Sequence, residues 1–148
     1  MTAGADRNRE SQLWAWLRKA ADMLRKGADV QRIENGVAKG TPDVEGCILG
    51  ETFWCELKVA HAMANDRWRI HITVSQVRRA RARRRAGGRS WVLIRACGAT
   101  AHLNRHYLVD GFDAERLLEP VSTDELQKMS AVHADASSDF ILQTMAGK

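Results

Sequence analysis

The chain has few cysteines, and their spacing matters more than their number. Three are present, Cys47, Cys55 and Cys97. They form no CxxC motif, and any disulfide would leave one thiol unpaired. Each lies in or beside a segment with a strand-like pattern, so we expect reduced, buried thiols. The spacing therefore argues against a disulfide framework and against a structural zinc site.

Long apolar runs are also missing. No stretch approaches the roughly 20 residues that cross a membrane, and the opening MTAGADRNRE lacks the apolar core of a secretory signal. The sequence has no internal repeat and no glycine-rich loop of the P-loop or dinucleotide-binding type. At 148 residues, with 28% charged residues, it has the composition of one globular unit. We therefore expect a cytoplasmic protein with no membrane partner and no nucleotide cofactor.

One region lacks acidic residues altogether. Between Arg67 and Arg95 there are ten arginines and no aspartate or glutamate. The rest of the chain sets the other 13 of the 23 basic residues against 18 acids, so this segment carries all of the positive excess. Such asymmetry indicates a surface that faces a polyanion.

The arginines concentrate in a helix predicted from about Val74 to Ala86. Thr73 and Gln76 form a capping box, which would give Gln76 a purely structural role at the start of the helix. Arginine fills six of the eight positions from 78 to 85, more than the helix dipole requires. We expect this helix end to project and to present six side chains to nucleic-acid phosphates: Arg78, Arg79, Arg81, Arg83, Arg84 and Arg85. A buried strand, Trp91 to Ala96, follows, which predicts a parallel crossover.

An earlier helix is predicted from Arg9 to Lys26, with Asn8 as its N-cap. Its apolar stripe consists of Trp14, Leu17, Ala21 and Leu24. Glu10 falls on the centre line of this stripe, where an acid needs a partner or a metal. Equally, Glu10 is an ordinary first-turn acid that the helix dipole favours. Glu34, at the end of a short strand predicted from Val30, is the slightly lower-ranked alternative carboxylate.

The stretch from Gly40 to Lys58 is predicted to be a hairpin with a turn at Gly50-Glu51. Alternation along its second strand, residues 53–59, places Trp54, Glu56 and Lys58 on one face. Asp43, at the mouth of the first strand, residues 44–49, can lie beside them. Two carboxylates and an ammonium group are the components of a site for a hard divalent cation and a water molecule. Residues 60–66 are predicted to be a loop, before a short extended piece at residues 68–72.

Pro42-Asp43 followed by Glu56-Leu57-Lys58 resembles the signature of PD-(D/E)XK nucleases. The Gly-Thr-Pro-Asp sequence, with Gln76 in a later helix, is similar to the virus-type replication-repair (VRR-NUC) branch, and the match covers residues 9–96. The resemblance implies an α/β fold of αβββαβ order, with a mixed sheet flanked by helices. It implies Mg²⁺ or Mn²⁺ held by Asp43, Glu56 and the Leu57 carbonyl, with Lys58, Gln76 and Glu10 as further catalytic residues. The setting it implies is a bacterial or phage-infected cytoplasm.

The activity expected from the resemblance is metal-dependent DNA cleavage, selective for branched DNA such as four-way junctions. The alternatives are a non-catalytic nucleic-acid-binding module that uses the arginine helix, and a partner-binding protein of a phage or mobile element. Residues 1–110 are predicted to form the nuclease core and 111–148 an acidic extension, helical or partly disordered. A homodimer is expected, with contacts from Phe140, Ile141 and Leu142 or from an edge near Tyr107.

Overall fold

A mixed seven-stranded sheet with helices on both faces forms the architecture. The computed structural model describes residues 3–24, 27–33 and 40–148. The elements in chain order are α1 (Ala3–Leu24), β1 (Ala28–Arg32), β2 (Val44–Ile48), β3 (Glu51–Met63), β4 (Arg67–Ile70), α2 (Val74–Arg85), β5 (Ser90–Ala96), η1 (Ala101–Leu103), β6 (Arg105–Asp110), η2 (Ala114–Leu118), β7 (Val121–Ser122), α3 (Thr123–Met129) and α4 (Ser138–Met145). Within the described ranges, no helix has the length and apolar character that a membrane crossing requires.

The long strand β3 is the centre of the sheet. It pairs with β2 and β4 in antiparallel fashion and with β5 in parallel, and β6 adds to β5 in antiparallel fashion. The chain passes from β3 to the parallel strand β5 by way of β4 and α2, so the predicted parallel crossover is present. The predicted α/β class, with a mixed sheet flanked by helices, is therefore confirmed.

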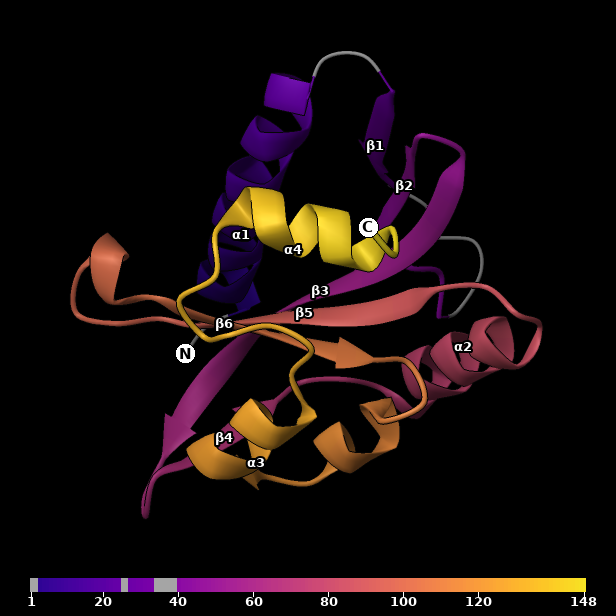
Figure 1. Ribbon diagram of the computed structural model, residues 1–148. Coiled ribbons are helices and arrows are strands. Elements are labelled where there is room, and N and C mark those ends of the chain that lie inside the picture. Colours follow the sequence, from indigo (N-terminus) through magenta and orange to yellow (C-terminus); the bar gives the residue numbers. More distant parts are fainter. Residues whose placement is uncertain (1–2, 25–26, 34–39) are drawn as a thin grey trace.

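Each face of the sheet carries its own apolar core. Figure 1 shows α1 and α4 on one side of the central strands, and α2 and α3 on the other. The odd residues Phe53, Cys55 and Leu57 of β3 are buried in the core beneath α1 and α4. The second core, beneath α2 and α3, includes Val92 and Ile94 of β5. The alternating residues of β3 therefore face two different environments.

The β2–β3 hairpin has its turn one residue earlier than predicted. Leu49 and Gly50 occupy the turn with φ angles of 50° and 86°, the left-handed values that a tight hairpin turn requires. Gly46 faces Phe53 across the ladder, and a Cβ at Gly46 would lie 2.2 Å from the ring atom Cζ of Phe53. The glycine therefore makes room for the largest fully buried side chain of the hairpin.

The prediction of a loop at residues 60–66 is wrong. Strand β3 continues to Met63 and turns back into β4, so that residues 60–63 pair with residues 67–70. Pairing with a neighbouring strand supplies the hydrogen bonds that hold these residues in an extended form, and a local pattern does not report such pairing. The predicted short extended piece at residues 68–72 is correct for residues 68–70, which belong to β4.

Helix α1 begins at Ala3, so Asn8 lies within it and does not cap it. The buried stripe is correct at Leu17 and Ala21, whereas Trp14 and Leu24 are only partly buried. Strand β1 begins two residues earlier than predicted, at Ala28. The three cysteines are free; Cys55 is buried, but Cys47 and Cys97 are half-buried, so the expectation of burial is right for one of the three.

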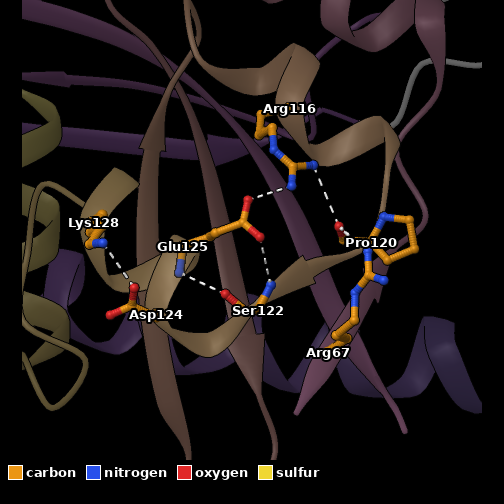
Figure 2. Close-up of polar contacts among 7 residues, drawn as sticks. All are labelled: Arg67, Arg116, Pro120, Ser122, Asp124, Glu125 and Lys128. Atoms are coloured by element: carbon orange, nitrogen blue, oxygen red, sulfur yellow. Dashed lines mark hydrogen bonds and ion pairs between the residues drawn. The ribbon is translucent and has the colours of Figure 1, made fainter. Parts of the chain in front are cut away.

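The segment from residue 111 onward lies on the core. Strand β7 pairs with β4, and the carbonyl oxygen of Pro120 accepts hydrogen bonds from Arg67 of β4 (3.1 Å) and from Arg116 (3.4 Å), as Figure 2 shows. Arg116 also bonds to Glu125. The capping box of α3, predicted from the sequence, is present between Ser122 and Glu125.

Two predicted contact surfaces for a second subunit are wrong. Ile141 and Leu142 are fully buried, in the core on the α1 face, and of that cluster only Phe140 is exposed. Tyr107 on β6 is also buried. The outer edge of β6 is covered, because Ala131 and His106 complete main-chain hydrogen bonds between β6 and the segment after α3. In sequence, an apolar cluster that contacts a second subunit has the same pattern as one that packs on the core of its own chain.

Candidate active site

The candidate site begins where β2 ends alongside β3. Val44, the first residue of β2, pairs with Cys55, so the next residues of β3 have no partner in β2. Asp43 fills this place with its side chain: its Oδ2 accepts a hydrogen bond from the Leu57 amide at 2.8 Å. The main chain of Asp43 is held in turn, because its carbonyl accepts from the Ile33 amide at 2.7 Å. The carboxylate is thereby fixed at the edge of the central strand.

Glu56 and Lys58 lie beside this carboxylate, on the face of β3 turned toward α2. Both are buried, with relative exposures of 7% and 8%. Nζ of Lys58 lies 3.8 Å from Oε1 of Glu56. The predicted common face is therefore present, and it holds one ammonium group against two carboxyl groups.

Gln76 joins the site from the first turn of α2. Its Nε2 donates to Oε1 of Glu56 at 2.6 Å, while its Oε1 accepts from the Thr73 amide at 3.0 Å. From the sequence, the capping role and the site role of Gln76 were difficult to separate. The side chain has both, because an amide has a donor end and an acceptor end. The cap orients the amide that reaches Glu56.

The pKa of Glu56 is raised to about 9. The largest cause is burial, followed by the negative charge of Asp43; the Lys58 ammonium opposes both, and a side-chain hydrogen bond with Asp43 and the charge of Glu10 raise the pKa further. Burial and a like charge both disfavour the ionised carboxyl. Ionised Glu56 would give the site more negative charge than Lys58 balances, and a bound cation would remove this penalty.

Glu10 thus lies close enough for its charge to act on Glu56. Because α1 begins at Ala3, Glu10 lies beyond the first turn, so its interpretation as a first-turn acid is wrong. Glu34 lies outside the described residues. The rings of His61 and His71 are in edge contact with each other, with centroids 4.6 Å apart. Of the two acids considered, the structure describes only Glu10.

The donors at this site suit a hard divalent cation. Asp43 and Glu56 provide carboxylate oxygens. The Leu57 carbonyl points to the same strand edge as the Leu57 amide, which donates a hydrogen bond to Asp43. Mg²⁺ is commonly held by one or two carboxylates together with waters and substrate oxygens. In the part of the chain that the structure describes, no three His, Cys, Asp or Glu side chains form a metal-binding group. The fit rests on two carboxylates and one carbonyl.

The arginines of α2 differ in their contacts and in their exposure. Arg81 pairs with Glu115 at 2.7 Å and Arg84 with Asp110 at 2.9 Å, so two of the six are engaged by acids near or within the extension. Two others, Arg79 and Arg83, lie over the ring of Trp54, at 5.4 and 4.0 Å from its centroid. The exposed members are Arg78, Arg79 and Arg85. The helix end is therefore not a free arginine surface all round.

The contact of Trp54 with the arginines was not predicted from the sequence. A usable signal was present, because Trp54 shares the strand face of Glu56, and residues 76, 79 and 83 share one helix face. The spacing of the two rows is readable from the sequence. Their meeting is not, since it depends on how α2 crosses β3.

The comparisons with known proteins agree with this architecture. No family model matches the sequence, and no curated protein matches it. Among solved structures, the chain is similar to the Holliday junction resolvase Hjc of the archaeal hyperthermophile Archaeoglobus fulgidus, with a TM-score of 0.57 and 11% sequence identity. The match covers 93% of this chain and 98% of that one. The chain therefore has the α/β fold of that resolvase.

Proposed function

We propose that this protein is a divalent-metal-dependent endonuclease that hydrolyses DNA phosphodiester bonds. The observation that carries the proposal is the placement of Asp43, which caps the Leu57 amide where β2 ends and thereby lies beside the buried Glu56 and Lys58. A hairpin does not need two carboxyl groups crowded together in a buried position. Their arrangement is explained if a cation and a phosphate complete it.

Asp43, Glu56 and the Leu57 carbonyl would hold one or two Mg²⁺ or Mn²⁺ ions. Such an ion, when bound, stabilises the charge that develops on the phosphate and lowers the pKa of the attacking water. Lys58 orients this water or takes its proton, and the low exposure of its ammonium group keeps it at one place. Gln76 orients Glu56 through the 2.6 Å hydrogen bond.

The substrate we propose is branched DNA. The support is the similarity to Hjc, which is a Holliday junction resolvase. The arginines of α2 suit phosphates better than base edges, so selectivity would come from DNA shape. A two-fold dimer would place two sites against a junction. The virus-type replication-repair relationship remains a prediction.

The experiment that tests this function compares a four-way junction, a linear duplex and a plasmid as substrates. With Mg²⁺ or Mn²⁺ we expect symmetric nicking of the junction in preference to the duplex, and no cleavage in EDTA. Light scattering should give twice the 16.6 kDa mass of the chain. Absence of cleavage with every metal, with DNA binding retained, would instead support a non-catalytic binding module. A monomer that cuts linear and branched DNA equally would refute only the proposed dimer and the proposed preference for branched DNA.

Glu10 offers a second test of the site. We expect Glu10→Gln to reduce cleavage strongly, because its charge acts on Glu56, whereas Glu34→Gln should change cleavage little. Single-turnover rates on the junction provide the measurement, and thermal unfolding of each variant is the control for folding. The reverse order would assign the additional carboxylate to Glu34.

A further inference from the structure

Helix α2 and strand β3 face each other with two matching rows of side chains. Gln76, Arg79 and Arg83 are separated by three and four residues and share one helix face. Opposite them lie Glu56 and Trp54, two residues apart on one strand face. Gln76 meets Glu56, and the two arginines meet Trp54. The candidate active site thus continues directly into an arginine–indole group.

Arg83 differs from its helix neighbours in its hydrogen bonds. Its guanidinium carbon lies 4.0 Å from the centroid of Trp54, and its side chain is half-buried. Its Nε is buried with no hydrogen-bond partner, and no described residue accepts from its other nitrogens. Arg81 and Arg84, in the same two turns, both have carboxylate partners. A half-buried cation without an acceptor is a group that a bound anion would satisfy.

The geometry holds this guanidinium in place before any ligand arrives. An arginine stacked on an aromatic ring keeps the donors at the edge of its plane available. On the other side, a Cβ at Gly88 would lie 2.6 Å from Nε of Arg83, so the side chain passes close to the glycine. Nε1 of Trp54 is a second buried donor without a partner. Because the buried Nε of Arg83 is fixed in this way, the terminal nitrogens of its half-buried side chain are held as the donors that a phosphate would contact.

We propose that Trp54, Arg79 and Arg83 bind a backbone phosphate of the DNA strand adjacent to the phosphate at the active site. Trp54 lies two residues from Glu56, or about 7 Å along β3, which is comparable to the step between neighbouring phosphates. Arg83 contacts the phosphate, Arg79 adds charge at the exposed edge, and Trp54 is a positioning residue for Arg83. This inference rests on the proposed function, since the scissile phosphate defines the neighbouring one.

The test measures DNA affinity at several salt concentrations, with Asp43→Asn as the background so that no cleavage intervenes. Each phosphate contact contributes about 0.9 to the log–log salt slope on duplex DNA. We expect Arg83→Ala to lower the slope by about that amount and to weaken binding roughly tenfold. The matched control is Arg81→Ala, whose side chain is paired with Glu115, and it should leave the slope unchanged.

Substitutions at Trp54 separate positioning from charge. Trp54→Leu should weaken binding without a change in slope, because the arginines remain, and Trp54→Phe should restore most of the affinity by keeping an aromatic face. If Arg83→Ala does not fold, Arg83→Gln keeps the stem on the indole and is measured in its place. A neutral methylphosphonate moved one phosphate at a time along a junction strand should weaken binding at one position. That effect should disappear in the Arg83 variant.

Equal slopes for the Arg83 variant and its background, or equal losses for Arg81→Ala and Arg83→Ala, would overturn the inference. If either result is found in a protein that cleaves junctions, the proposed nuclease function stands and only the phosphate site is refuted. If no cleavage occurs with any metal but the slope difference is present, the phosphate-binding role of Arg83 is supported and the catalytic proposal falls. Absence of DNA binding would refute both.

Discussion

Replacing Asp43 by asparagine is expected to abolish DNA cleavage while leaving the fold intact. Asparagine retains a side-chain oxygen that can accept from the Leu57 amide, so the 2.8 Å hydrogen bond can persist. The lost charge removes a metal ligand, and the ion's stabilisation of the transition state is several kcal/mol. Since each 1.36 kcal/mol is a factor of ten, cleavage should fall at least about a thousandfold. Single-turnover rates on a four-way junction with Mg²⁺ provide the measurement.

The matched control for Asp43→Asn is Asp29→Asn, an exposed acid on the neighbouring strand β1. This variant should retain the wild-type rate. DNA affinity without metal should be unchanged or slightly tighter in Asp43→Asn, because a negative charge beside the phosphate is lost. Calorimetry should detect metal binding in the control and none in the Asp43 variant. Full cleavage by Asp43→Asn would contradict the nuclease assignment.

Replacing Glu56 by glutamine should also abolish cleavage, but it should make the metal-free protein more stable. The pKa of Glu56 is raised to about 9 in the folded protein, chiefly by burial and by the charge of Asp43. The unfolded chain loses this proton near its ordinary pKa of 4.5. The folded state therefore binds more protons between these values, and the contribution of Glu56 to the free energy of unfolding falls as pH rises from 4.5 to 9.

Glutamine has no proton to lose, so the stability gain of Glu56→Gln should increase with pH across that interval. Thermal unfolding in EDTA at pH 5 and pH 8 measures it, with an expected difference of several degrees at the higher pH. The control, Glu45→Gln, changes an exposed acid of the same hairpin and should not have this pH dependence. Added Mg²⁺ should reverse the order, because it stabilises only the protein that binds it. An equal stability gain of Glu56→Gln at both pH values would show that Glu56 is ionised in the folded protein without penalty.

These two predictions have one physical origin. The site places Glu56 near both Asp43 and Glu10, with Lys58 as the nearby cation, in a buried position. Such a group is costly for folding in the absence of a ligand. Sites arranged for catalysis commonly reduce stability in this way, and their disruption commonly raises it. A purely structural polar cluster would lose stability on the same substitution.

The sequence alone determined the features that depend on local periods. Alternation along a strand places Trp54, Glu56 and Lys58 on one face whatever the rest of the chain does. The capping boxes at Thr73 and Ser122 need only residues three apart, and both are present. The apolar strand Trp91 to Ala96 after a helix suggested a parallel crossover, and β5 does pair with β3 in parallel.

Tertiary structure decided the features that depend on residues far apart in the chain. The side chain of Asp43 meets the Leu57 amide because of the register of β2 on β3. Strand β3 extends to Met63 because β4 pairs with it. Ile141 and Leu142 belong to the core because the last helix packs on the α1 face of the sheet. None of these contacts leaves a local pattern.

The division of the arginines is the clearest case. Six arginines on one helix are equivalent in sequence, yet Arg81 and Arg84 are neutralised by Glu115 and Asp110, which lie 34 and 26 residues further along the chain. Arg83 instead stacks on Trp54 and has no described acceptor. Charge counts report a total, whereas the free energy of each charge depends on its distance to the nearest opposite charge and on its burial. Those two quantities exist only once the sheet has brought distant segments together.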